Sequence, residues 1–260
     1  FLGGNDWFTP GFWEGGQVPN SINHVAIRTQ ATTHSIALNG HAEAWTLLIS
    51  DGNEIVTGNR YLSVFGHLTM EGEATHIDIQ SGGTLMIRVD ASPADEFDIV
   101  GNGRITIRSG GELDLSEAGH DVSLSELTVE SGASDVDIPY DLYLHRGMTI
   151  GAGVDVTVGN DLTIGESSSM VSNITDTTVH VANDVDIHSG TLRLTNSTFN
   201  ITHHLSAAES DDASILLYDS SLISDYMFLG FTAGMDCDIV LDSSGGGEPA
   251  LLTTGTSITR

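Results

Sequence analysis

Residues 101–129 read GNGRITIRSGGELDLSEAGHDVSLSELTV, and this stretch decides the fold. Its apolar side chains stand two residues apart in short groups such as Ile105-Thr106-Ile107, and Gly, Ser, Asn and Asp separate the groups. Apolar residues at i and i+2 give an extended chain one buried face, whereas a helix needs them three and four residues apart. Each group therefore predicts a strand of about three to five residues. Similar groups follow at 85–87, 162–164, 185–187 and 192–194.

The groups form three interleaved series with a step of about 20 to 23 residues, which is in the range of known repeat proteins. Their members are Leu85, Ile105, Leu127, Met148, Met170 and Leu192 in the first, Leu113, Val136, Val156, Val179, Phe199 and Leu222 in the second, and Leu124, Leu144, Ile164 and Ile187 in the third. Three short strands per step are what one coil of a triangular solenoid requires. We therefore predict an all-β, right-handed parallel β-helix with about 21 residues per coil and about a dozen coils.

A solenoid predicts a specific burial pattern. Inward aliphatic side chains of successive coils stack on one another at a spacing of about 4.8 Å and form a continuous core. We expect the following side chains to be almost inaccessible to solvent: Ile107, Val129, Ile150, Ile164 and Ile187.

The competing architecture is an antiparallel sandwich, which also has short strands with frequent turns. Two observations favour the solenoid. The step is kept over at least five coils, and the dipeptides typical of two-residue hairpin turns, Asn-Gly and Asp-Gly, are rare, occurring at Asn39-Gly40 and Asp51-Gly52 near the start of the chain and at Asn102-Gly103.

Both ends of the sequence differ from its middle. Residues 1–23 contain two of the three Trp and two of the five Pro, which predicts an aromatic cap over the first coil, because an open coil exposes unpaired strand edges. Residues 24–225 are interpreted as the coils. Residues 226–260 are interpreted as terminal coils with a Gly-rich loop at 243–247, and the strand-like residues 251–260 suggest a longer native chain.

The opening also resembles a known group of proteins. Trp7, Gly11-Phe12-Trp13-Glu14-Gly15-Gly16-Gln17-Val18-Pro19 and the following Val25-Ala26-Ile27 resemble the start of autotransporter-like bacterial surface β-helix proteins. The segments Ser81-Gly82-Gly83-Thr84-Leu85 and Ser109-Gly110-Gly111-Glu112-Leu113 fit the coil pattern of that group. The resemblance implies a secreted or surface-displayed fibre, and it transfers no catalytic residues.

Charge limits the classes of partner. Thirty-six Asp and Glu stand against eight Arg and no Lys, for a net charge of −28. Such a chain is unsuited to nucleic acid or to an anionic membrane surface, both of which attract basic proteins. Suitable partners are cations, neutral glycans, and other copies of the chain at high ionic strength. We predict an extracellular or cell-surface location. The single Cys237 allows no intrachain disulfide; it is interpreted as a buried thiol, with an intermolecular bridge as the alternative.

Two series of acidic residues recur at the coil spacing. One contains Asp135, Asp155, Asp176 and Asn196, and the other contains Asp121, Asp141, Asp161 and Asp184. Ionised carboxylates stacked between coils repel one another unless cations bridge them, so Asp135, Asp155, Asp176, Asp141, Asp161 and Asp184 are candidate Ca²⁺ ligands. The simpler interpretation is that Asp is a common turn residue. We expect no other cofactor.

Three further kinds of site have candidates. Asn173, Asn196 and Asn200 begin N-x-S/T sequons and are candidate glycosylation sites. Trp7, Phe12 and Trp13 are candidates for a glycan-stacking platform if their rings are exposed, and for a cap if they are buried. An enzyme on the same scaffold would use carboxylates of adjacent coils beside a basic residue, and Arg88 and Arg108, one ordinary step apart, stand near Asp90, Glu112 and Asp114.

The sequence therefore predicts a non-catalytic structural protein, a subunit of a surface fibre, sheath, layer or adhesin that associates with copies of itself. A glycan-binding module is the first alternative, and a polysaccharide lyase or hydrolase is the second.

Overall fold

The computed structural model describes residues 5–28, 33–88, 97–165, 170–208, 210–230, 235–242 and 250–259. These residues form an all-β protein, a parallel β-solenoid of about nine turns. The chain divides into two compact units, 1–136 and 137–260. No helix among the described residues is long and apolar enough to cross a membrane.

Unit 1 begins with a short 3-10 turn, η1 (Pro10–Phe12), and continues with short strands in repeating order. These strands are β1 (His24–Ile27), β2 (Ser35–Ala37), β3 (Ala42–Ala44), β4 (Thr46–Ile49), β5 (Glu54–Val56), β6 (Tyr61–Val64), β7 (Leu68–Met70), β8 (His76–Ile79), β9 (Thr84–Arg88), β10 (Phe97–Gly101), β11 (Arg104–Ile107), β12 (Glu112–Glu117) and β13 (Asp121–Val129). The next strand, β14 (Val136–Ile138), begins at the last residue of unit 1 and pairs with β16 (Val156–Val158) of unit 2.

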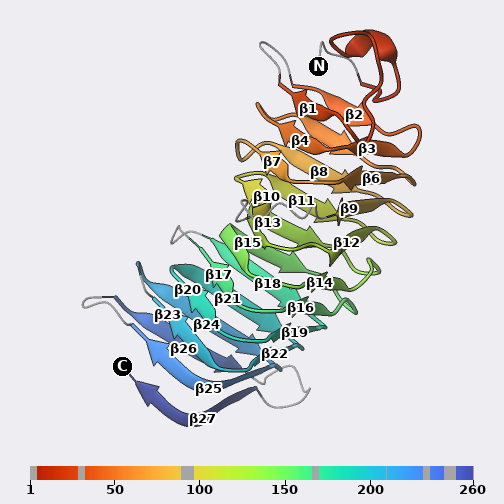
Figure 1. Ribbon diagram of the computed structural model, residues 1–260. Helices are drawn as coiled ribbons and strands as arrows, with labels where there is room; N and C mark the ends of the chain where they lie inside the picture. Colours follow the sequence, from red (N-terminus) through yellow and green to blue (C-terminus); the bar gives the residue numbers. More distant parts are fainter. Residues whose placement is uncertain are drawn as a thin grey trace. The chain divides into compact units, whose positions relative to one another are not determined.

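The strands of unit 1 form three parallel stacks, because a strand pairs with the strand three places earlier in the chain. One stack is β1, β4, β7, β10 and the start of β13, and a second is β2, β5, β8, β11 and the end of β13. The third is the four-stranded sheet of β3, β6, β9 and β12, which lie one beside the next in Figure 1. Each coil thus contributes three strands, as predicted.

Unit 2 repeats the same construction. Its strands are β15 (Leu142–Ile150), β16 (Val156–Val158), β17 (Leu162–Ile164), β18 (Val171–Thr175), β19 (Thr178–Val181), β20 (Val185–Ile187), β21 (Gly190–Thr195), β22 (Thr198–Ile201), β23 (His204–Ala207), β24 (Ala213–Tyr218), β25 (Ser221–Leu229), β26 (Cys237–Asp242) and β27 (Leu251–Thr259). The stacks are β16, β19, β22 and β25; β17, β20, β23 and the end of β25; and β18, β21, β24 and β26. Strand β27 pairs with β25.

The core lies inside the coils and confirms the predicted burial. Ile107, Val129, Ile150, Ile164 and Ile187 are at most 4% exposed. Inward positions alternate with outward ones, as in β11, where Ile105 and Ile107 are buried and Arg104 and Thr106 are half-buried. Every strand pair with a described register is parallel, so the antiparallel sandwich is wrong.

Most predicted partners within a unit also lie opposite each other. In unit 1, Ile105 lies opposite Leu127. In unit 2, one stack contains Leu144, Ile164 and Ile187, and a second stack contains Val156, Val179, Phe199 and Leu222.

One predicted partner in unit 1 is wrong. Leu85 lies opposite Leu113, whereas Ile105 lies opposite Ile77. The reason is a longer coil, in which the chain between β9 and β10 adds residues before β10 pairs with β7. The ordinary step from Leu85 to Ile105 therefore joins two different stacks.

A second predicted partner, in unit 2, is also wrong. Met170 precedes β18, and the residue opposite Leu192 is Ser172.

The predicted number of coils is also wrong, since the structure has about nine turns in place of about a dozen. Long connections and the segment before β1 account for the remaining residues.

Candidate functional site

The segment before β1 packs on the first coil through its tryptophans. Trp7 is fully buried and Trp13 is 5% exposed, and their ring centroids lie 4.9 Å apart in an edge-to-face arrangement. Trp13 Nε1 donates a hydrogen bond to the carbonyl oxygen of Trp7 at 2.7 Å. The Trp7 N–H donates to the carbonyl of Ala37 in β2 at 3.2 Å, so the segment covers the outer edge of that strand. The buried rings cannot stack on a sugar, and Phe12 is half-buried.

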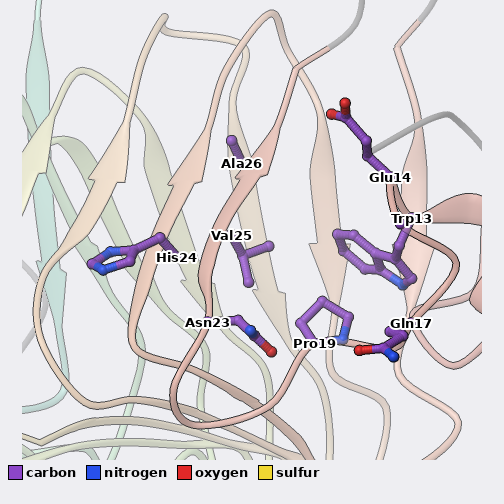
Figure 2. A pocket seen from close by; sticks show the side chains of 9 residues that line it. Trp13, Glu14, Gln17, Pro19, Asn23, His24, Val25 and Ala26 are labelled. Atoms are coloured by element: carbon purple, nitrogen blue, oxygen red, sulfur yellow. The ribbon is translucent and has the colours of Figure 1, made fainter.

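A cleft of about 410 Å³ lies between this segment and β1. Figure 2 shows Trp13, Pro19 and Val25 around its centre, with the carboxylate of Glu14 and the ring of His24 directed away from it. His24 Nδ1 lies 2.8 Å from Thr46 Oγ1 of the next coil. The walls are therefore the underside of the cap and the first core strand, and Gln17 and Asn23 add polar groups to the lining.

The structure stacks one predicted series of Asp residues in unit 2. The Oδ1 atom of Asp141 accepts from the N–H of Asp161 at 3.0 Å, and that of Asp161 accepts from the N–H of Asp184 at 3.0 Å. The side-chain amides of Asn160 and Asn183 donate to the same two oxygens. We call this set, Asp141, Asn160, Asp161, Asn183 and Asp184, the carboxylate ladder.

The carboxylate ladder ends in two histidines of the next coil. His204 Nε2 lies 3.1 Å from Asp184 Oδ2, and His203 Nδ1 lies 3.8 Å from Asp184 Oδ1. Each Asp is thus bonded to polar groups of the following coil, and these contacts offset part of the repulsion between the stacked carboxylates. Among the described residues, no three His, Cys, Asp or Glu side chains form a group able to hold a metal ion.

The other predicted acidic series is only partly stacked. Asp176 and Asn196 both have positive φ, 51° and 47°, and the Asn196 amide donates to Asp176 Oδ1, so these two are successive corner residues. The residue stacked on Asp176 from the preceding coil is Gly153, whose N–H donates to the Asp176 carbonyl at 2.9 Å. Asp155 instead accepts from the N–H of Thr178 at 3.2 Å. Asp135 is exposed and lies in unit 1.

The three sequon residues occupy two kinds of position. Asn196 is an exposed corner residue, whereas Asn173 in β18 and Asn200 in β22 are half-buried on outward strand positions. Asn173 lies opposite Arg193, and Asn200 lies opposite His180. Asn196 is therefore the sequon whose position leaves most room for a glycan, although its amide bonds to Asp176.

The two arginines that sequence analysis placed together lie on different stacks. Arg88 in β9 bonds to Glu117 Oε1 at 2.7 Å, whereas Arg108, after β11, bonds to Asp78 Oδ1 at 2.8 Å and to Glu130. They do not stack because the long coil shifts the register between them. Asp90 lies outside the described residues.

A second chain of hydrogen bonds crosses the outer face of the Arg108 stack. His76 Nδ1 lies 3.0 Å from Glu54 Oε1, and Nε2 lies 2.9 Å from Thr106 Oγ1. A carboxylate, an imidazole and a hydroxyl from three successive coils are thus connected. The contacts tie the coils together on a regular strand face, and sequence analysis missed them because the long coil lies between His76 and Thr106 and hides the repeat.

Sequence analysis also missed a groove on the sheet of β3, β6, β9 and β12. It has a volume of about 490 Å³, and we call it the lateral groove. Its lining consists of Glu43, Tyr61, Ser63, Phe65, Thr84, Met86, Arg88, Glu112 and Asp114. Three of these, Arg88, Glu112 and Asp114, belong to the group suggested for a catalytic alternative.

Comparisons with protein-family models, with curated proteins and with solved structures find no match to this chain.

Proposed function

We propose that the chain is a non-catalytic extracellular structural protein, a subunit of a cell-surface fibre, sheath, layer or adhesin. The observation that carries the proposal is the bonding between coils. Main-chain ladders, an aliphatic core and side-chain ladders such as Asp141–Asp161–Asp184 connect each coil to the next within a unit. This bonding is repeated from coil to coil, as a mechanical or display framework requires.

Composition and resemblance support an outside location. A chain with a net charge of −28 and no lysine suits a salty environment, where ions screen its carboxylates over a few Å. The opening from Trp7 to Pro19 resembles that of autotransporter-like surface proteins, and the tryptophans of that opening form the buried contact with the first coil.

Self-association has a candidate surface in unit 2. Strands β26 and β27 each pair with one described strand, β24 and β25, and their other edges have no partner among the described residues. Val240, Leu241 and Leu251 on these strands are 45%, 50% and 52% exposed. An unpaired strand edge with apolar side chains is a template for pairing with another chain.

Imaging and sedimentation of the purified chain test the proposal. We expect filaments, sheets or large oligomers whose formation increases from low to high salt, because screening removes repulsion between acidic copies. Added Ca²⁺ should exceed the effect of Na⁺ at equal ionic strength if cations bridge carboxylates. Val240→Lys should weaken assembly, and Thr157→Lys, on an outward strand position away from that edge, should not.

Two results would contradict the proposal. A chain that stays monomeric at all salt and Ca²⁺ concentrations would not be an assembling subunit. Release of new reducing ends from polysaccharides incubated with the chain would show catalysis.

A further inference from the structure

The lateral groove is built from outward positions of four neighbouring strands. Three rows of side chains cross the sheet of β3, β6, β9 and β12. The middle row is Glu43, Ser63, Met86 and Asp114, which are register partners on the four strands. The upper row, named from the start of the strands, is Tyr61, Thr84 and Glu112, and the lower row contains Phe65, Arg88 and Glu117.

The hollow arises because the middle row has a small residue between large neighbours. Ser63 is 3% exposed, although it occupies an outward position. Tyr61 is the first residue of β6, and Phe65 directly follows its last residue, with the Phe65 N–H donating to the carbonyl of Ala44 at 3.0 Å. Four residues of extended chain place the Cα atoms of Tyr61 and Phe65 about 13 Å apart. The two rings therefore stand on opposite sides of a floor formed by Ser63 and Met86.

One aromatic wall is held in place by a second ring. His41 stacks on Tyr61 with ring centroids 3.6 Å apart and an interplanar angle of 9°. A ring fixed in this way loses little conformational entropy when a ligand packs against its exposed surface. Aromatic walls with a few polar groups between them are typical of small-molecule sites.

The polar groups of the groove are mainly hydrogen-bond acceptors. Glu43 and Asp114 stand at the two ends of the middle row, and Glu112 is beside Asp114, with Oε2 accepting from Thr84 Oγ1 at 3.2 Å. The cation in the lining, Arg88, is paired with Glu117 at 2.7 Å. The Glu43 carboxylate has no hydrogen-bond or ion-pair partner among the described residues. Ligand groups that donate hydrogen bonds fit this lining, and ligand carboxylates or sulfates do not.

We propose that the lateral groove binds a short oligosaccharide of neutral or amine-bearing sugars, lying across the four strands. The sugar rings pack against Tyr61 and Phe65, and their hydroxyl or amino groups donate to Glu43, Glu112 and Asp114. The four strands span about 14 Å at three inter-strand spacings, which exceeds a single sugar ring. The groove and the candidate assembly edge are built from different strands, β3, β6, β9 and β12 in unit 1 and β26 and β27 in unit 2.

A peptide fits the groove less well than a sugar. Peptides that bind sheets add a strand to an edge, where main-chain groups are unpaired. The groove lies on the face of the sheet, where the main chains of β6 and β9 are already paired on both sides.

Titration calorimetry of the full chain tests the proposal. The probes are oligomers of glucose, of N-acetylglucosamine, of glucosamine and of galacturonic acid, and a lysine-rich peptide. We expect binding of at least one of the first three and none of the galacturonate oligomer. Tyr61→Ala and Ser63→Leu should each weaken binding at least tenfold, the first by removing a wall and the second by filling the floor. Glu43→Gln should weaken the glucosamine oligomer more than the neutral ones, because it removes a negative charge.

Matched controls separate the groove from the rest of the surface. Tyr218→Ala removes an outward, half-buried tyrosine from β24 in unit 2, and Glu126→Gln neutralises an outward carboxylate on β13. Both should bind as the parent does. Circular dichroism confirms that each variant is folded, and Tyr61→Ala remains informative if Ser63→Leu does not fold. The proposal is overturned by absence of sugar binding, by equal losses in the controls, by preference for galacturonate, or by binding of the peptide alone.

Discussion

The carboxylate ladder of unit 2 predicts that neutralising one of its acids stabilises the protein. Asp161 accepts hydrogen bonds from the N–H of Asp184 and from the Asn183 amide, and Asp141 and Asp184 lie one coil away on either side. Carboxylates stacked at a spacing of about 4.8 Å repel by about 1 kcal/mol per pair in a water-like dielectric. Removing the charge of Asp161 therefore relieves about 2 kcal/mol of repulsion in total.

The substitution decides whether this gain is kept. Asp161→Asn keeps an oxygen as acceptor and loses only the charge assistance, so we expect a net gain of about 1 kcal/mol in the free energy of unfolding. Asp161→Ala relieves the same repulsion but leaves the two donors without their acceptor, at a cost of about 1 kcal/mol for each hydrogen bond. The alanine variant should therefore be about 2 kcal/mol less stable than the asparagine variant.

Urea unfolding at neutral pH in the presence of a chelator measures these differences. The gain from Asp161→Asn should shrink in about 1 M salt, where the screening length is about 3 Å, whereas the difference between the two variants should remain. Asp137→Asn, on an exposed outward position of β14, is the control and should have little effect. Equal stability of the two Asp161 variants would refute the role of the hydrogen bonds, and an asparagine variant less stable than the parent would refute the repulsion. Added Ca²⁺ that stabilises the parent more than Asp161→Asn would identify a cation in the ladder, and equal gains would contradict one.

Three further predictions concern the core, a close backbone approach and the thiol. Phe199 is fully buried, so Phe199→Ala should lower the free energy of unfolding by about 3–5 kcal/mol, whereas Asn200→Ala next to it should change it by less than about 0.5 kcal/mol, as measured by urea unfolding. Gly101 has a φ of 127°, and a Cβ there would overlap the carbonyl oxygen of Met70. Gly101→Ala should therefore lower the free energy of unfolding by more than about 2 kcal/mol, and an unchanged melting temperature would contradict this. Partial burial raises the pKa of the Cys237 thiol to about 11. Alkylation by iodoacetamide should therefore be slow at pH 8 and accelerate as the pH rises toward about 11, and a rate already maximal at pH 8 would contradict this.

The period of the coils is readable from the sequence because burial imposes it. An inward side chain such as Phe199 must find an aliphatic partner one coil before and one coil after, here Val179 and Leu222. That requirement leaves a repeated apolar pair at a nearly constant step. Where the step is constant, as in most of unit 2, the predicted partners are the observed ones.

The step fails to identify partners where corners differ in length. Leu85 and Ile105 are separated by one ordinary step, yet Leu85 pairs with Leu113 across a longer one. Apolar strand residues are chemically equivalent in all three stacks, so nothing in the residue types distinguishes a true partner from a residue of the next stack. The same ambiguity placed Arg88 and Arg108 together.

The lateral groove was hidden for a related reason. Its middle row, Glu43, Ser63, Met86 and Asp114, has unequal steps along the sequence and four unlike side chains. Outward positions carry no shared apolar signal, so their partners become visible only when the register of the inward positions is known. The carboxylate ladder was easier to find from the sequence, because its Asp residues are alike and occur at corners of regular coils.

The long coil of unit 1 has a practical consequence for engineering. Strand β9 ends at Arg88 and β10 begins at Phe97, yet Leu85 still lies opposite Leu113 and Ile105 opposite Ile77 in unbroken parallel stacks. The entropy of closing a flexible connection increases only by about 0.6 kcal/mol for each doubling of its length. Corners of this scaffold are therefore insertion points, at which foreign peptides can be displayed while the strand stacks keep their register.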